Sequence, residues 1–212
     1  MNVPVILSIS YFGPVSWYAW HLAAKTTLIE AHENYQRQSY RNRCRILGSN
    51  GVVNLIVPVV HGHRPGQPIR EIRIDYRSRW QEVHQRTLMS AYRHAPYYQF
   101  YMDELDMFWS RRWDYLYDLN TESTSKLLKM LGLKSPVQLT SSYLNGEMEV
   151  SDLREQIHPK NAHPDPGFQP PSYYQVFSDR HAFVPDLSIL DLLFCLGPDA
   201  NAYLNSCLPV RI

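Results

Sequence analysis

The sequence predicts an α/β fold, in which an N-terminal strand–helix–strand unit and a β-hairpin form a mixed sheet and a mainly helical second half packs against it. Two patterns support this prediction. An apolar run, a segment with helical spacing and a β-branched run follow one another within residues 3–31, as in a unit with two parallel strands. Asn50-Gly51 then lies between two extended runs, and Asn-Gly is a strong hairpin signal.

The strands are expected mainly in the part of the chain before residue 77. The apolar run 3–10 is followed by Gly13-Pro14, which indicates a buried strand and then a turn. Helical spacing of Trp17, Trp20 and Ala24 predicts the first helix. In order, we expect a strand at 3–10, a helix at 15–24, a strand at 27–31, hairpin strands at 44–47 and 52–60, a loop at 61–68 and a strand at 69–75.

The second half is expected to be mainly helical. Trp80, His84, Leu88 and Ala91 fall on one stripe, which predicts a long helix that Pro96 ends. In order, the other expected elements are a helix or irregular segment at 97–113, a helix at 123–131, a short strand at 138–143, a turn of helix at 152–156, an extended segment at 174–177 and a helix at 187–196. The Pro-rich residues 159–171 are expected to form a long loop, either a lid or binding loop or a plain surface excursion.

Length and composition indicate one globular domain spanning residues 1–212, with a sheet-rich part at 1–76 and a mainly helical part at 77–212. The net charge of +1 gives no overall attraction to nucleic acid or to acidic membranes, so we expect neither as a partner. Three scattered cysteines do not suit a disulfide framework and indicate a reduced, cytoplasmic protein. No run of about 18 uncharged apolar residues is present that could span a membrane.

Common catalytic and cofactor motifs are absent from the sequence. It contains no GxSxG, Walker A, HExxH or GxGxxG motif, which removes the usual basis for assigning a hydrolase, an NTPase, a metalloprotease or a dinucleotide-binding enzyme. His61 and His63 form an HxH pair, but no third ligand follows at a metal-like spacing. We therefore expect neither a metal nor a cofactor.

Residues 32–45, HENYQRQSYRNRCR, are the stretch most typical of a binding site. They bring together arginines, amides and tyrosines that form directed hydrogen bonds, and they lack the Gly and Pro of loops built only for turning. The stretch starts where the second strand ends, and the 11–14 turn starts where the first strand ends. Ligands of such folds bind beyond the carboxyl ends of the strands. We therefore interpret 32–45 as the floor of a pocket for a polar or anionic ligand, with a solvated surface loop as the alternative.

Three residues are candidates for catalysis. His32, directly after the second strand, and His84, on the inward stripe of the long helix, are candidate general bases, with a structural histidine as the alternative for each. Cys44 is a candidate nucleophile if a neighbouring cation lowers the pKa of its thiol, although the start of a strand also suits an inert buried thiol. The candidate substrate-binding residues from the same reasoning are Asn34, Gln38, Arg41, Asn42, Arg43 and Trp80, the last of which would stand with His84 in the opposite wall of the pocket.

Several segments together resemble the WbqC-like protein family. They are HENYQRQSYRNRC at 32–44, the Asn-Gly hairpin leading to LIVPV, WQEVHQRTLMSAYRHAPYYQFY at 80–101, YYQVF and LSILDLLFCLG, and they run in order along nearly the whole chain. The resemblance implies a role in bacterial surface-polysaccharide (O-antigen) metabolism, in which a sugar is decorated through an amide or acyl link. The positions it singles out are the candidates above other than Cys44, together with Tyr35, Tyr92, Gln175 and Asp191, so Tyr35 and Tyr92 join the substrate-binding candidates.

We therefore expect a cytoplasmic transferase that moves an acyl or aminoacyl group to an amine of a sugar nucleotide or similar acceptor. His32 or His84 would remove a proton from the attacking amine, while Arg41 and Arg43 bind phosphate or carboxylate. The expected partners are a small-molecule substrate, either a sugar nucleotide or a carrier-bound acyl group, and an acyl or peptidyl carrier protein. The alternatives are a non-catalytic protein that holds a nucleotide or carrier-bound intermediate, and a thiol-based acyl carrier step at Cys44.

Overall fold

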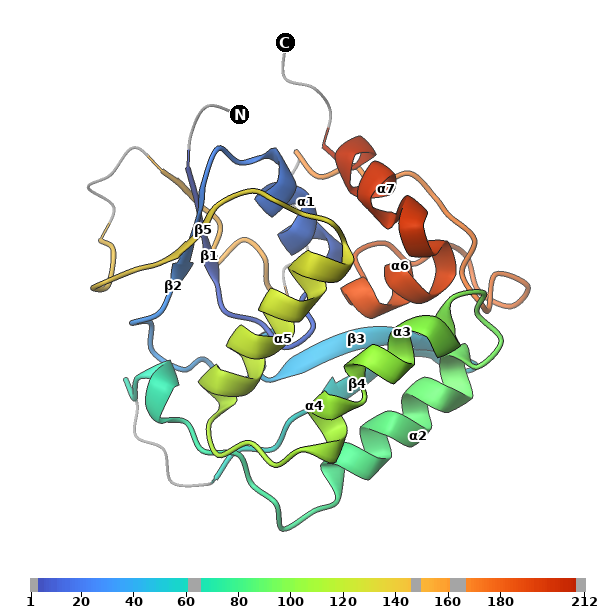
Figure 1. Ribbon diagram of the computed structural model, residues 1–212, viewed down its shortest axis with the longest axis horizontal. Coiled ribbons are helices and arrows are strands. Elements are labelled where there is room, and N and C mark those ends of the chain that lie inside the picture. The colour runs from blue at the N-terminus through green and yellow to red at the C-terminus, as the bar shows by residue number, and fades with distance from the viewer. Residues whose placement is uncertain (1–3, 61–65, 146–149, 161–166, 209–212) are drawn as a thin grey trace.

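A computed structural model of the chain describes residues 4–60, 66–145, 150–160 and 167–208 (Figure 1). It confirms the α/β class. The strand–helix–strand unit consists of β1 (Val5–Ser8), α1 (Val15–Ala23) and β2 (Thr27–Glu30), and β1 pairs with β2 in parallel. A helical crossover is needed here because the end of one parallel strand lies far from the start of the next.

Two strands from the second half of the chain complete the parallel sheet, whose strand order is β5-β2-β1-β6. β5 (Val137–Leu139) pairs with β2, and β6 (Ser151–Asp152) pairs with β1. The hairpin of β3 (Arg43–Gly48) and β4 (Gly51–Ile56) forms a separate antiparallel pair. Parallel and antiparallel pairing therefore both occur, as predicted, but in two sheets, because β5 and β6 already occupy both edges of the β1–β2 pair.

The second half contains mainly helices and few strand residues, as the sequence predicts. The helices are α2 (Trp80–Tyr92), α3 (Tyr98–Leu105), α4 (Met107–Ser110), α5 (Leu116–Met130), α6 (Ile189–Leu196) and α7 (Ala200–Ser206), with the 3-10 turns η1 (Ile69–Glu71) and η2 (Gly197–Asp199). In Figure 1 the parallel sheet lies at one end of the molecule, α2, α3 and α4 lie at the other, and the hairpin runs between them.

Three expected elements differ from the structure. Residues 69–75, expected to be a strand, form η1 and then only isolated bridges, so their imperfect alternation does not produce a ladder. Residues 152–156, expected to be a turn of helix, start at the last residue of β6 and then form a single turn, in which the Ile157 N–H donates to the Leu153 carbonyl at 3.1 Å. α5 begins at Leu116 rather than at 123, because Leu116 and Leu119 are buried on the same stripe as the later apolar residues of the helix.

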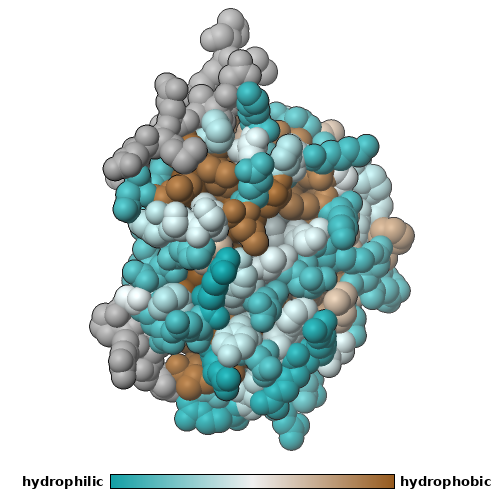
Figure 2. All heavy atoms as spheres, turned by 60° about the vertical axis from the view of Figure 1, so that its left-hand side comes forward, coloured by the Kyte–Doolittle hydropathy of each residue, from teal (hydrophilic) through white to brown (hydrophobic). Residues whose placement is uncertain are grey.

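The molecular surface is unevenly hydrophobic. Figure 2 shows hydrophobic side chains gathered in a band across the upper part of the face in view, with mainly hydrophilic side chains below it. Exposed apolar side chains include Val137 and Leu139, which lie on the edge strand β5. Within the described ranges, no helix combines the length and the hydrophobicity needed to cross a membrane.

Candidate functional site

A cavity of about 200 Å³ lies beside the turn that joins β1 to α1. The polar and aromatic residues that line it are Ser16, Trp20, Tyr40, Arg45, Gln156, His158, Phe168 and Asp186. It shares Tyr40 and Ile157 with a smaller space that is lined by residues 7–10 at the carboxyl end of β1, the edge at which α/β folds bind ligands. The cavity is smaller than the roughly 300–1,000 Å³ of pockets that enclose a whole ligand, so it suits one group of a larger substrate.

Asp186 places a carboxylate between this cavity and the first turn of α1. Its Oδ1 accepts a 2.8 Å hydrogen bond from the backbone N–H of Ser16, and its Oδ2 accepts a 3.0 Å hydrogen bond from the Ser16 hydroxyl. Burial raises the pKa of Asp186 to about 6, against the effect of these hydrogen bonds and of the positive charge on Arg45. A carboxylate with a pKa close to neutral is suited to accept and release a proton at physiological pH.

Arg45 brings a positive charge to the same cavity. It lies on β3, where its carbonyl accepts a 2.7 Å hydrogen bond from the backbone N–H of Ser188. Burial raises the pKa of the neighbouring Tyr40 to about 12, so this phenol stays protonated and able to donate a hydrogen bond. A guanidinium and a carboxylate in one cavity suit a ligand that carries both an anionic group and an amine.

Two N–H groups complete the polar lining of the cavity. His158 Nδ1 accepts a 3.1 Å hydrogen bond from the backbone N–H of Lys160, so the neutral ring carries its proton on Nε2. Burial lowers the pKa of His158 and outweighs the opposing charge of Glu155, which keeps the ring neutral at pH 7. The indole N–H of Trp20 is buried and has no hydrogen-bond partner in the part of the chain that the structure describes. A substrate oxygen would satisfy such a donor.

Arg41 lies behind this cavity in a buried ion pair. Its Nη2 is 2.5 Å from Glu33 Oε2 and donates a 2.7 Å hydrogen bond to the Ser8 hydroxyl. With Ser8 and Ser10 it also lines an adjoining space of about 10 Å³, which shares wall residues with the larger cavity. The Ser10 hydroxyl and Arg41 Nε are buried and have no partner among the described residues. Arg41 therefore acts first as an anchor for the floor that the sequence predicts.

Backbone strain is concentrated in the segments that approach the cavity. In the described ranges, the non-glycine residues with a left-handed backbone are Phe12 (φ 42°), Gln38 (φ 59°) and Asp186 (φ 54°). Phe12 lies in the turn between β1 and α1, Gln38 lies two residues before Tyr40, and Asp186 lines the cavity itself. Strained conformations of this kind cluster at functional sites, which supports the assignment of the cavity as a candidate site.

The arginines of the predicted stretch lie close to the candidate site. Arg41 is buried and Arg43 is half-buried at the start of β3, and both are near enough to His158 for their charge to lower its pKa further. Asn42 is buried between them, but its amide donates a 3.0 Å hydrogen bond to the Val57 carbonyl. That amide holds the chain beside the hairpin and is not directed at a ligand.

The other predicted side chains of the stretch do not line the cavity. Asn34 and Gln38 are exposed, and His32 and Tyr35 are half-buried. His32 is held by a 2.9 Å hydrogen bond from its backbone N–H to a carboxylate oxygen of Glu30. None of these four contributes to the walls of the two spaces near Arg41 and Asp186, so their roles in binding or catalysis stay predictions.

His84 and Trp80 lie in the core and not in a cavity wall, which corrects the predicted arrangement. His84 is 3% exposed, its Nδ1 accepts a 2.9 Å hydrogen bond from the Tyr11 hydroxyl, and its Nε2 lies 3.2 Å from the Ile56 carbonyl, to which it donates. The Tyr11 hydroxyl accepts a 2.9 Å hydrogen bond from the Trp109 indole, which fixes this direction. Because both ring nitrogens are used and the ring is sealed, His84 cannot take a proton from a bound substrate.

We expect His84 to make the stability of the fold depend on pH. Burial lowers its pKa from 6.5 to about 4, so the unfolded chain binds this proton first as the pH falls. The contribution of the neutral His84 ring to the free energy of unfolding is complete above pH 6.5. It falls by roughly 3 kcal/mol as the pH decreases to about 4. Urea unfolding of the wild type and of His84→Gln should therefore show a stability difference that shrinks between pH 7 and about pH 4.5. A difference that does not change with pH would contradict this assignment.

Cys44 is also sealed in the core. It is 1% exposed, and burial raises the pKa of its thiol to about 12 against the opposing effect of a hydrogen bond with Ser188. The reactive thiolate is therefore not available at neutral pH. Of the two alternatives for this residue, the structure supports the inert buried thiol and not the nucleophile.

Tyr92, a predicted substrate-binding residue, belongs to a buried network. Its hydroxyl donates a 2.7 Å hydrogen bond to Asp191 Oδ2 and accepts one of 3.2 Å from the backbone N–H of Leu47. Asp191 Oδ1 accepts further hydrogen bonds from the Tyr173 hydroxyl at 2.5 Å and from Gln175 Nε2 at 3.2 Å. The network connects α2, α6, β3 and the segment at 173–175, so Tyr92 has a structural role.

None of the residues that line the cavity belongs to the predicted catalytic and binding sets, and those missed include Tyr40, Arg45, His158 and Asp186. Tyr40 and Arg45 lie inside the predicted stretch 32–45. Residues at both ends of the predicted loop 159–171 line the cavity, while its residues 161–166 lie outside the described part of the chain. Asp186 has no signal of this kind, because only the fold brings it to α1.

Comparison with known proteins places the chain in a family. The uncharacterized protein Rv1507c of Mycobacterium tuberculosis is 27% identical to it over 203 residues, a match that covers 82% of this chain and 84% of that protein. No solved structure matches the chain significantly. The model of the WbqC-like protein family matches residues 10–163, a range that includes the β1–α1 turn, Tyr40, Arg45 and His158 but ends before Asp186. The chain therefore belongs to the WbqC-like protein family.

Proposed function

We propose that this protein is a transferase that moves an acyl or aminoacyl group to an amine of a sugar nucleotide or similar acceptor, and that the reaction takes place at the cavity of Arg45 and Asp186. The observation that carries the proposal is the placement of the Asp186 carboxylate in the same cavity as the Arg45 guanidinium, and the raised pKa of Asp186 supports it. The resemblance associates the family with bacterial surface polysaccharide, which supports a sugar as the acceptor. We also propose that the protein acts in the cytoplasm.

In this scheme the anionic group of the acceptor supplies most of its affinity, and its neutral amine is placed next to the base. Its amine lies at Asp186 and its phosphate or carboxylate group lies at Arg45, which can form paired hydrogen bonds to such a group. The side chains of Trp20 and His158 line the same space, and the N–H group of His158 would donate to an uncharged oxygen of the substrate. These contacts would orient the amine before the donor arrives, which is the main way that binding energy serves a transfer reaction.

The chemical step is attack of the amine nitrogen on the carbonyl carbon of an acyl thioester. A C–N bond forms and the C–S bond breaks, Asp186 takes the proton lost by nitrogen, and the departing thiolate is protonated to a thiol. We therefore propose Asp186 as the general base in place of His32 or His84. A general base must reach the reacting atom and have a pKa near the working pH. An acyl or peptidyl carrier protein would deliver the thioester.

A non-catalytic binding protein is the second candidate function. The observation that favours it is the burial of His84 and Cys44, which removes two of the three predicted catalytic residues from the walls of the cavity. The same cavity would then hold an amine-bearing ligand for a partner enzyme without changing it.

Mass spectrometry distinguishes the two functions. The wild-type protein is incubated with a uridine-diphosphate amino sugar and acetyl, glycyl or longer acyl thioesters, and the mixture is searched for the amide product. The transferase proposal requires product with at least one donor from the wild type and a large loss with Asp186→Asn. Stabilisation of the fold by the amino sugar with no product from any donor would support the binding protein instead.

A further inference from the structure

A second polar surface is built on a short ribbon of two chain segments. The backbone N–H of Ile74 donates to the Asp114 carbonyl at 3.0 Å, and that of Leu116 donates to the Ile72 carbonyl at 2.9 Å. Ile72, Ile74 and Leu116 are buried beneath the ribbon, while Arg73 is exposed on its outer face. The buried side chains hold the exposed ones in a fixed frame.

Aromatic rings hold the arginines of this surface in place. The guanidinium of Arg73 lies 5.4 Å from the centre of the Tyr115 ring and donates to the Tyr115 hydroxyl at 3.3 Å. The guanidinium of Arg112 lies 4.5 Å from the centre of the Tyr76 ring, whose hydroxyl is fixed by hydrogen bonds with the backbone of Trp113 at 2.8 and 3.1 Å. Stacking leaves the edge N–H groups of a guanidinium free to bind an anion, and a side chain that is already ordered loses less entropy on binding.

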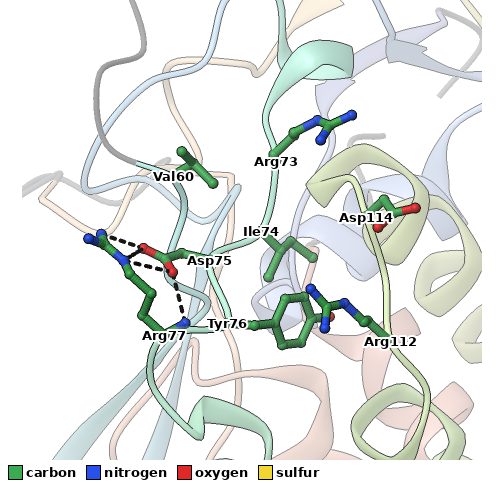
Figure 3. Close-up of a pocket in the computed structure, with 8 residues that line it drawn as sticks. All are labelled: Val60, Arg73, Ile74, Asp75, Tyr76, Arg77, Arg112 and Asp114. Atoms are coloured by element: carbon green, nitrogen blue, oxygen red, sulfur yellow. Dashed lines mark hydrogen bonds and ion pairs between the residues drawn. The ribbon is translucent and has the colours of Figure 1, made fainter.

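These side chains surround a cavity of about 430 Å³, here called the arginine groove, with Arg73, Asp75, Tyr76, Arg77, Arg112 and Asp114 in its walls. Figure 3 shows Arg73, Asp114 and Arg112 on one side and the Asp75–Arg77 pair on the other, with Ile74 between them. The volume lies within the roughly 300–1,000 Å³ of small-ligand pockets.

The charges of the groove are not equivalent. Arg77 is paired with Asp75 through contacts of 2.6, 2.9 and 3.1 Å, so its charge is largely compensated. Within the described ranges, Arg73 and Arg112 form no ion pair, although both are exposed at the groove. Asp114 is exposed beside them, and its carboxylate also forms no ion pair there. Two ordered guanidinium groups that form no ion pair therefore face one space, and the Asp114 carboxylate at its edge is near enough to Arg73 for their charges to interact.

We propose that the arginine groove binds the phosphate group of a small organic phosphate through Arg73 and Arg112. The planar N–H donors of two arginines match the oxygens of a phosphate. Asp114 repels the phosphate but accepts hydrogen bonds from hydroxyl groups, so it would favour a phosphate that is attached to a sugar. This binding site is separate from the cavity at Asp186 and does not depend on the proposed transferase activity.

Binding of inorganic pyrophosphate, followed by calorimetry or NMR, tests the two arginines. Arg73→Gln/Arg112→Gln should weaken binding by at least about tenfold, because each loses charge-assisted hydrogen bonds. The matched control is Arg86→Gln/Arg93→Gln, which changes the net charge equally at exposed positions on and next to α2. It should leave binding nearly unchanged. Equal weakening in both variants, or no binding to the wild type, would overturn the proposal.

Asp114→Asn supplies a test that misfolding cannot imitate. Removal of the repelling carboxylate should tighten pyrophosphate binding several-fold, since like charges near a site oppose an anion. The wild type should also bind glucose 1-phosphate more tightly than inorganic phosphate, and Asp114→Asn should reduce that preference. Unchanged pyrophosphate affinity in Asp114→Asn would contradict the groove as the binding site, as would tight binding of an RNA oligonucleotide without binding of pyrophosphate.

Discussion

Replacing Arg41 with methionine is expected to lower the free energy of unfolding by roughly 3–5 kcal/mol, because it leaves a buried carboxylate without its partner. Glu33 is 3% exposed, and its ion pair with Arg41 and its hydrogen bond from Ser8 are what oppose the cost of burial. That burial already raises the pKa of Glu33 in the intact protein. Urea unfolding at pH 7 measures the loss.

Two further variants separate the ion pair from a general effect of losing an arginine. Arg180 pairs with Asp179 at an exposed position, with 61% of its side chain accessible, so Arg180→Met should cost less than about 1 kcal/mol. Adding Glu33→Met to Arg41→Met should recover most of the loss, because two apolar side chains of suitable size often replace a buried pair without penalty. If Arg41→Met were as mild as Arg180→Met, the anchoring role of Arg41 would be wrong.

Asp186→Asn is expected to reduce turnover by about 10²-fold or more, while the affinity for the amino-sugar acceptor changes little. Asparagine tolerates the left-handed backbone at this position and can still accept a hydrogen bond from the first turn of α1, so the fold should persist. It cannot accept a proton from the amine. Separate measurements of kcat and of acceptor binding show which step is lost, and Asp179→Asn is the matched control at an exposed position.

The pH dependence of the reaction carries the same information. Because burial raises the pKa of Asp186 to about 6, the base is ionised above that pH and protonated below it. The kcat/KM of the wild type should therefore rise as the pH increases through about 6. Asp186→Asn should lose this limb of the profile. A limb that survives in the variant would assign the base to another residue.

The sequence predicts the elements whose causes are local. The strand–helix–strand unit and the hairpin follow from short-range periodicity and from turn residues, and the structure confirms both. The rule that ligands bind beyond the carboxyl ends of strands also leads to the cavity, since the strands fix that position without reference to individual side chains. β5 and β6 show the limit, because short strands gain their pairing from β1 and β2 rather than from their own pattern.

The chemistry of the site depends on contacts between distant parts of the chain. His84 lies on an inward helical stripe, a position that suits a pocket wall and a core equally well. The structure places His84 in the core, where the Tyr11 hydroxyl and the Ile56 carbonyl form hydrogen bonds with the two nitrogens of its ring. Asp186 shows the reverse case, because its carboxylate gains a role only when the fold brings it to Ser16 and Arg45. The contacts of His84 and of Asp186 both join residues far apart in the chain, so the spacing of residues in the sequence does not predict them.

The most direct measurement is a crystal structure of the protein with a uridine-diphosphate amino sugar bound. The account predicts that the amine lies within hydrogen-bond distance of the Asp186 carboxylate and that an anionic group of the ligand contacts Arg45, beside the turn between β1 and α1. A ligand bound elsewhere, with solvent alone at Asp186 and Arg45, would contradict the assignment of this cavity as the functional site.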